Sequence, residues 1–257
     1  MFKSYTVPVQ LLGVDTNAKT VKGQGKAFMT GILYMAPADL SGVNFCPMAE
    51  IAKCKAPCLF TAGRGAMTSV EQARLNKANY FNADPEAFMR HIALDVYRLV
   101  VRAGNAGMTP VVRLNGTQDI RWERIPVTVT AELARRIGKP EGTYANIFAL
   151  FPEVQFYDYT KIPNRRDIPA NYDLTFSYSG VPEFAPYVAK AIANGMRVAV
   201  VFRDRATAEQ AIAHGFHGHP CVDGDDSDIR HLDPHGVYVA LYAKGRAKTD
   251  TSGFVVG

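Results

Sequence analysis

Short apolar runs alternate with amphipathic stretches along most of the chain after residue 27. Apolar or β-branched runs bounded by glycine, proline and polar residues are typical of buried strands, whereas apolar positions that recur every three or four residues indicate helices. The pattern predicts strands within 28–36, 109–116, 153–161, 172–180, 196–203, 218–222 and 236–245, and helices within 69–81, 84–103, 128–150, 183–194 and 207–214. Strands and helices therefore alternate, as they do in parallel βαβ units.

The clearest predicted helix begins at Asp84-Pro85 and runs to about Ala103. Proline is tolerated in the first turn of a helix, where its missing N–H has no partner to lose. The apolar positions that follow it, Phe88, Ile92, Val96, Leu99 and Val100, recur at helical spacing. One face of this helix is therefore expected to pack on the sheet.

Six or seven such strands favour a complete or partial (β/α) barrel of the TIM type over an open sheet. Neither an internal repeat nor a linker divides the chain, so we expect a single α/β domain over residues 1–257. Residues 1–27 are predicted to be an N-terminal arm or to add extra strands. A long loop at 38–66 follows the first core strand and holds three cysteines.

Composition places the chain among globular proteins. Hydrophobic residues make up 47% of the 257 positions and charged residues 21%, which argues against disorder. No apolar run reaches the ~20 residues of a membrane span. The first residues lack the apolar core of a signal peptide, so a cytoplasmic protein is expected, in the host cytoplasm if the gene is a phage gene. The net charge of +5 favours polyanions such as nucleic acid, the alternative being a basic surface without a partner.

Cys46, Cys54 and Cys58 are spaced C-x7-C-x3-C. Thiolates are soft ligands that suit zinc or iron–sulfur clusters, and a disulfide framework is unusual in a cytosolic chain. Buried cysteines can also act as small hydrophobic residues. The prolines, lysines and glycines around these three argue against that, so the sequence predicts a metal or iron–sulfur site.

Three cysteines are one ligand short of a closed structural zinc site. A fourth ligand would come from the histidine-rich segment near the C-terminus, where the candidates are Cys221, His217 and His219. Otherwise the site is a [4Fe–4S] cluster with one open iron. The aspartates that follow, 223, 225 and 226, are read as a polar loop with Asx turns in preference to a cation site.

Two predicted strands end in dense polar groups. Ligands bind at the carboxyl ends of the strands in barrels and in open α/β sheets. The first group is Arg113, Asn115, Gln118 and Asp119, with Asp119 as a base and Arg113 holding a carboxylate or phosphate; the alternative is an Asn-Gly turn with a capping aspartate. Ser177 ends another strand and could add a polar contact to a bound cofactor.

The second group follows the strand at 153–161. Asp158 and Lys161 are candidate catalytic residues, and Tyr157, Tyr159, Arg165 and Arg166 are candidate substrate-binding residues. Tyrosines that stack on bases and cations that meet phosphates suit a nucleotide or nucleic acid. The alternation of side chains along a strand predicts that Asp158 points away from the two tyrosines. The alternative is a solvated loop with structural salt bridges.

A cysteine loop directly after the first strand of a βα barrel resembles the layout of radical S-adenosylmethionine enzymes, whose motif is C-x3-C-x2-C. CPMAEIAKCKAPC, RLNGTQD and YDYTK together resemble, over residues 28–180, a group of phage and plasmid proteins typified by a mycobacteriophage gene product. The resemblance implies a phage-type barrel protein and supplies no reaction. A [4Fe–4S] cluster and bound S-adenosylmethionine are the cofactors that the radical-enzyme layout implies.

Asp158 followed by Pro163 and Arg165 also resembles the strand-end motif of tRNA-guanine transglycosylases. That resemblance implies base exchange on nucleic acid, with Asp158 as nucleophile, Asp119 as base and a structural zinc. A third interpretation is a nucleic-acid-binding protein without catalytic activity, in which the metal only fastens the cysteine loop. The leading hypothesis is a cluster-bearing barrel enzyme that acts on a nucleotide or nucleic acid.

Overall fold

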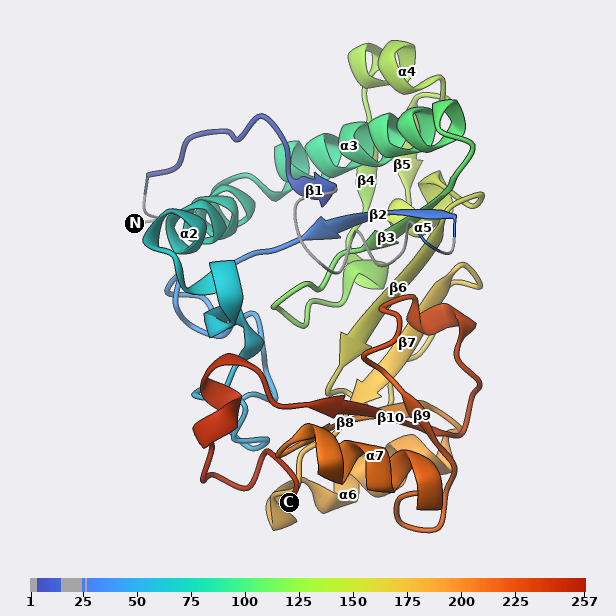
Figure 1. Cartoon of the computed structure of the whole chain (residues 1–257). Helices are drawn as coiled ribbons and strands as arrows, with labels where there is room; N and C mark the ends of the chain where they lie inside the picture. The colour runs from blue at the N-terminus through green and yellow to red at the C-terminus, as the bar shows by residue number, and fades with distance from the viewer. Residues whose placement is uncertain (1–3, 15–24, 26) are drawn as a thin grey trace.

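A computed structural model describes residues 4–14, 25 and 27–257. Its main sheet has the strand order β1-β2-β3-β6-β7-β8-β10-β9 (Figure 1). The strands are β1 (Leu12–Val14), β2 (Phe28–Leu33), β3 (Thr109–Arg113), β6 (Gln155–Thr160), β7 (Tyr172–Ser177), β8 (Arg197–Phe202), β9 (Cys221–Asp223) and β10 (Tyr238–Tyr242). The helices are α2 (Thr68–Ala83), α3 (Pro85–Asn105), α4 (Ala131–Ile137), α5 (Ile147–Leu150), α6 (Ala185–Ala193) and α7 (Arg205–His214).

All neighbouring strands of this sheet run parallel except β1, which is antiparallel to β2. From β2 to β8 the parallel strands lie in chain order, as they would in a barrel. The sheet does not close, so the prediction of a complete barrel is wrong. Among the described residues, the two edge strands of the sheet are β1, which pairs with β2, and β9, which pairs with β10. β1 and β9 do not pair with each other.

Figure 1 shows a sheet that turns from β2 to β10, with α3 lying over one end and α6 and α7 under the other. β1 confirms the predicted extra strand near the N-terminus; residues 1–3, 15–24 and 26 of the predicted arm lie outside the described residues. No helix in the described ranges is both long and apolar enough to cross a membrane.

α3 carries much of the packing against β2 and β3. Phe88, Ile92 and Val96 have no exposed surface, in agreement with the helical spacing of the apolar positions. The Asp84 side chain accepts a hydrogen bond from the N–H of Ala87 at 2.9 Å and so caps the helix where the sequence predicts its start.

The predicted helical stretch at 128–150 is confirmed only in part, because it contains two short helices and two strands. A two-stranded antiparallel sheet of β4 (Val127–Val129) and β5 (Gly142–Tyr144) brackets α4, and the short helix α5 follows. Thr130 caps α4, and Gly138 ends it in the left-handed conformation (φ 65°), which glycine adopts without strain. Thr130 and Gly138 therefore confine the helix to a short part of the predicted stretch.

A buried ion pair fastens the amino-terminal ends of β7 and β8. The guanidinium of Arg197 is fully buried and donates to both carboxylate oxygens of Asp173, at 2.7 and 2.5 Å. It also donates to the hydroxyl of Thr175 at 3.1 Å and to the carbonyl of Arg230 at 2.7 Å. Four acceptors from two segments, β7 and the turn at Arg230, therefore depend on one side chain.

We predict that Arg197→Ala lowers the free energy of unfolding by about 3–5 kcal/mol, because the carboxylate of Asp173 loses its partner in a mostly buried position. Urea denaturation monitored by circular dichroism measures the change. The matched control is Arg205→Ala, which breaks an exposed ion pair with Glu209 and should cost less than about 1 kcal/mol. Equal losses in the two variants would contradict the prediction.

Candidate active site at the carboxyl ends of the strands

The carboxyl ends of β3, β6, β7 and β10 and the cysteine loop surround one cavity of about 310 Å³. Its polar and sulfur-bearing lining residues include Cys46, Cys54, Cys58, Arg113, Asn115, Gln118, Asp119, Tyr159, Lys161, Ser177, Asp225, Asp228, Tyr242 and Lys244. Nine of the residues predicted from the sequence, the three cysteines among them, therefore line one cavity.

 A tenth, Ser177, lies at the end of β7 and lines the same cavity.

The cysteine loop is held by its own turns. The N–H of Ala49 donates to the carbonyl of Cys46 at 3.0 Å, and the N–H of Cys54 donates to the carbonyl of Ala49 at 3.1 Å. The Cys46 sulfur accepts from the N–H of Ala38 at 3.3 Å and lies 3.8 Å from the carbonyl oxygen of Thr117. The loop is therefore tied both to the end of β2 and to the segment that follows β3.

Burial controls the protonation of these thiols. It raises the pKa of Cys46 to about 12 and raises the pKa values of Cys54 and Cys58 as well. The neighbouring ammonium of Lys161 acts in the opposite direction on Cys54 and Cys58. Without a further positive charge the three side chains are neutral thiols at neutral pH.

In the part of the chain that the structure describes, no three His, Cys, Asp or Glu side chains lie close enough together to hold a metal ion. The three cysteines share a cavity without forming a coordination shell. The candidate fourth ligands Cys221, His217 and His219 are not among the residues that line this cavity. Cys221 instead lies on β9, buried among apolar side chains.

The segment after β3 folds back on itself through two amides. The Asn115 side chain accepts from the N–H of Ile120 at 3.0 Å and from the indole N–H of Trp122 at 2.9 Å. The Gln118 side chain accepts from the N–H of Met35 at 3.2 Å and donates to a backbone carbonyl at 2.6 Å. Both amides line the cavity, but their hydrogen bonds hold the loop.

Gly116 lies in this segment where the chain passes closest to the end of β2. Its N–H donates to the carbonyl of Leu33 at 3.0 Å, and a Cβ here would approach that oxygen to 2.6 Å. Only glycine permits this approach without displacing the backbone. The Asn-Gly pair therefore brings the loop against the cysteine-bearing side of the cavity.

Asp119 and Lys161 form the polar wall nearest the cysteines. One carboxylate oxygen of Asp119 accepts from the backbone N–H of Lys161 at 2.8 Å. The other lies 3.8 Å from the guanidinium of Arg165 and, among the described residues, accepts no hydrogen bond. The Lys161 ammonium donates to the carbonyl and hydroxyl oxygens of Ser177, both at 3.1 Å, and to the carbonyl of Tyr178 at 3.0 Å.

The cavity lining also contains a cation that is paired with a carboxylate. Arg113 is 3% exposed and donates to the carboxylate of Asp228 at 3.2 Å. Its guanidinium lies 4.6 Å from the centre of the Tyr159 ring. The cavity is therefore lined by charges of both signs and by an aromatic ring.

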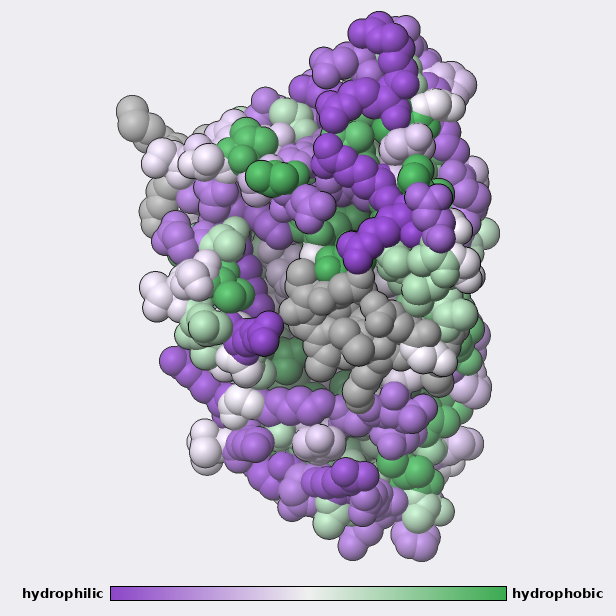
Figure 2. All heavy atoms as spheres, turned by 45° about the horizontal axis from the view of Figure 1, so that its top comes forward, coloured by the Kyte–Doolittle hydropathy of each residue, from purple (hydrophilic) through white to green (hydrophobic). Residues whose placement is uncertain are grey.

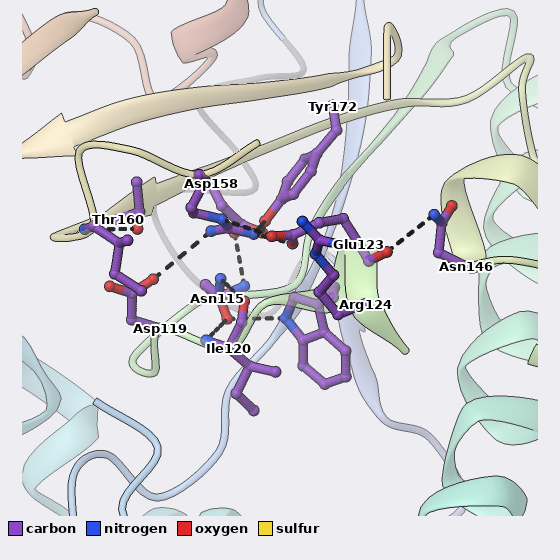
Figure 3. Close-up of polar contacts among 12 residues, drawn as sticks. Asn115, Asp119, Ile120, Glu123, Arg124, Asn146, Asp158, Thr160 and Tyr172 are labelled. Carbon is purple, nitrogen blue, oxygen red and sulfur yellow. Dashed lines mark hydrogen bonds and ion pairs between the residues drawn. The ribbon is translucent and has the colours of Figure 1, made fainter. Parts of the chain in front are cut away.

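Asp158 lies outside the cavity, on the other face of β6 from Tyr159. Figure 3 shows its carboxylate among Asn115 and Tyr172: it accepts from the N–H of Asn115 at 2.7 Å and from the hydroxyl of Tyr172 at 2.9 Å. Both oxygens are thus occupied. The predicted alternation along β6 is confirmed, since Tyr157 packs with Val111 on the face opposite to Asp158.

The predicted substrate-binding residues do not form one surface. Tyr157 is fully buried, and only Tyr159 lines the cavity. Arg165 is held by the buried carboxylate of Glu123, and both side chains are 1% exposed. Arg166 is exposed, and it lines with Arg165 a separate hollow away from the cysteines. Arg165 is accordingly part of the fold's internal salt bridges.

Sequence reasoning missed the residues that close the cavity from the C-terminal side. Asp225 and Asp228 lie in the loop that was predicted to be only polar, and Lys244 follows β10. The Asx turn is present, since the N–H of Asp225 donates to the Asp223 side chain at 2.7 Å. The rule that polar residues at strand ends form sites would have identified Lys244.

Fold and site together define the class of this protein. It is an α/β protein with an open, mostly parallel sheet and a polar, cysteine-lined cavity at the carboxyl ends of the strands. The chain belongs to the Gene product 88 family, which it matches over residues 10–257. This match confirms the predicted resemblance to phage-type gene products. No curated protein and no solved structure gives a significant match.

We predict that Asp158→Asn removes a pH dependence from stability. Burial raises the pKa of Asp158 from its ordinary 3.8 to about 7. Between those values the folded protein keeps a proton that the unfolded chain has released, so the free energy of unfolding falls as the pH rises, by up to ~1.4 kcal/mol per pH unit. The asparagine variant should lack this slope.

Denaturation at a series of pH values from about 4 to 8 measures the slope. Asp167→Asn is the control, because that carboxylate is 78% exposed and pairs only at the surface with Arg124. Parallel stability curves for the wild type and Asp158→Asn would show that the buried carboxyl does not titrate in this range.

Proposed function

We propose that this protein is an iron–sulfur enzyme, radical-SAM-like in layout, that acts on a nucleotide or nucleic acid. The observation that carries the proposal is that Cys46, Cys54 and Cys58 all line the same cavity as the polar strand ends. Cysteines with only a packing role have no reason to share a cavity with two lysines and three aspartates.

The chemistry of the donor set fits a [4Fe–4S] cluster. Each cysteine of such a cluster binds a different iron atom, so the sulfurs need not converge as they do around one ion. Three thiolates leave one iron open, which agrees with the absence of Cys221, His217 and His219 from the lining. When bound, the cluster would supply one-electron transfer and an open coordination position at the cavity.

The fold supports the same proposal. Parallel strands in chain order from β2 to β8 are what a partial (β/α) barrel requires, and the cysteine loop follows β2, its first parallel strand. We include S-adenosylmethionine as a proposed second ligand on this layout. Asn115 and Gln118 would hold the wall against which it binds, and Ser177 would fix the ammonium of Lys161.

The residues that line the cavity suit a small charged group of the substrate. A cavity of about 310 Å³ lies at the lower end of the usual range for small-molecule sites. The ring of Tyr159 offers a face to a planar base, and Arg113 offers donors to a phosphate or carboxylate. Asp119 lines the cavity, where its carboxylate accepts the N–H of Lys161, and is the candidate base.

The two other interpretations gain less support. The transglycosylase mechanism needs Asp158 as a nucleophile, and this carboxylate lies outside the cavity with both oxygens occupied. A metal that only fastens the loop gives no reason for the charged strand ends that face it. We therefore keep the cluster enzyme as the proposed function and treat a purely structural metal as an outcome of the test.

Protein purified without oxygen is predicted to be brown, with absorbance near ~400 nm and about four irons per chain. Replacing any one of Cys46, Cys54 and Cys58 by alanine should remove most of the iron, because each would bind a different iron atom. Iron and zinc analysis with the visible spectrum measures this. Cys221→Ala is the matched control and should keep both the colour and the iron.

A colourless wild-type protein with one tightly held zinc would contradict the proposal and favour a structural metal. So would wild-type protein that holds neither metal after its cluster has been reconstituted with iron and sulfide. Loss of iron from Cys221→Ala to the same extent as from the other three variants would show that the ligand set is wrong.

Lys161→Met is predicted to make the reduction potential of the cluster more negative. The reduced cluster carries one more negative charge, and the ammonium beside the cysteines stabilises it. A redox titration followed by electron paramagnetic resonance measures the potential. Lys139→Met is the control, because Lys139 lies over the aromatic ring of Phe151 and does not line the cavity. Equal potentials in the wild type and the two variants would contradict the prediction.

A further inference from the structure

Four exposed cations lie on the two segments that flank the cysteine side of the cavity. Lys53 is in the cysteine loop, Arg64 is in the turn η2 (Gly63–Ala66), and Arg246 and Lys248 are in the turn η6 (Gly245–Thr249). None of the four has a carboxylate partner among the described residues. We call these four residues the cationic rim.

The two segments of the rim touch although they lie far apart in the sequence. The N–H of Arg246 lies 3.5 Å from the hydroxyl of Thr61, and Gly245 packs against the backbone of Ala62. The hydroxyl of Ser252 donates to the carbonyl of Lys53 at 3.3 Å. The folded chain therefore brings together the segments that carry the rim.

The two segments that carry the rim also line the cavity. Cys54 and Leu59 on the first segment, and Ala247 and Phe254 on the second, line the cavity. The rim cations are next to these residues or within a few positions of them in the chain.

The charge of the rim is not balanced by nearby acids. Asp39 and Glu50 both pair with Lys55, at 2.8 and 3.0 Å. Asp250 is buried and accepts hydrogen bonds from Ser252 and from a backbone N–H. With Lys55 and the three carboxylates counted, an excess of two positive charges remains, which favours a polyanion over a single small anion.

We propose that the cationic rim binds the phosphates of a nucleic-acid strand, one nucleotide of which enters the cavity. This inference rests on the proposed function and narrows its substrate from a nucleotide or nucleic acid to a strand. A cavity of about 310 Å³ holds one nucleotide-sized group at most, so an enzyme that modifies a base in a strand must take that base out of the stack. Neighbouring phosphates would then remain outside, at the rim.

A protein partner is disfavoured by the same surface. Of the two segments, large apolar side chains are exposed only on the first and just after it among the described residues, at Leu40, Val43, Leu59 and Met67, and none is exposed on η6. A stable protein interface buries a continuous apolar centre, with cations at its edge. Phosphates, in contrast, need only cations in solvent-exposed positions.

The test compares two double variants with equal loss of charge. Arg246→Gln/Lys248→Gln removes half of the rim, and Arg135→Gln/Arg136→Gln removes two exposed cations from α4, which Figures 1 and 2 show at the other end of the molecule on a hydrophilic surface. Binding of a fluorescent single-stranded oligonucleotide is measured by anisotropy over a range of salt concentrations. Thermal melting establishes that each variant is folded.

The rim variant should bind more weakly, and the slope of log affinity against log salt should fall by about 0.7 for each phosphate contact removed. Adding Lys53→Gln and Arg64→Gln should lower it further, while the α4 variant should match the wild type. Equal losses in the rim and α4 variants would overturn the proposal. Competition by polyglutamate as strong as by the oligonucleotide would also overturn it, because the rim would then serve any acidic polymer or protein.

The metal content of the same samples separates the two proposals. Iron-loaded protein that binds no oligonucleotide would leave the iron–sulfur proposal standing and overturn the rim. Iron-free protein whose oligonucleotide binding depends on the rim would support the rim and count against the proposed function. A wild-type protein that binds the free mononucleotide as tightly as the strand would also overturn the rim.

Discussion

One buried carboxylate, that of Asp158, joins the elements on which the candidate site is built. It accepts the N–H of Asn115, directly after β3, and the hydroxyl of Tyr172, at the start of β7, while its own residue belongs to β6. The Asn115 side chain in turn holds the turn that follows, and Asp119 lies within that turn. The Asp119 carboxylate therefore meets the N–H of Lys161. The polar wall of the cavity thus depends on a carboxylate that does not line it.

The charges in the cavity explain why the cysteines and the strand ends belong to one site. Burial makes a thiolate costly; Lys161 lowers this cost for Cys54, and Arg74 and Lys161 lower it for Cys58. The same lysine is itself buried, and its pKa is lowered by that burial, so its charge depends on the oxygens of Ser177 and Tyr178. A group that keeps the cysteines as thiolates would also keep the ammonium charged. Each half of the site stabilises the charged form of the other.

Much of the fold and part of the site could be predicted from the sequence. The strand ends at 113–119 and 158–161, the helix from Pro85 and the opposite orientations of Asp158 and Tyr159 follow from spacing alone. The closure of the sheet could not be predicted, because it is decided by pairing at its edges, where β1 and β9 have three residues each. The role of Asp225 and Asp228 depends on which side of the sheet their loop crosses, and local sequence does not encode that.

The open sheet agrees with the nucleic-acid strand that we propose as the substrate. In a closed eight-stranded barrel the interior is filled by side chains, and ligands reach only the loops at its end. Here β2 and β10 are not neighbours, and the cysteine loop and η6 lie across the carboxyl ends of the strands in place of further strands. The cavity is therefore bounded on one side by loop segments that carry unpaired cations. Such a site places its reactive side chains next to a charged outer surface. The proposed nucleic-acid strand, of which one nucleotide reacts, requires this arrangement.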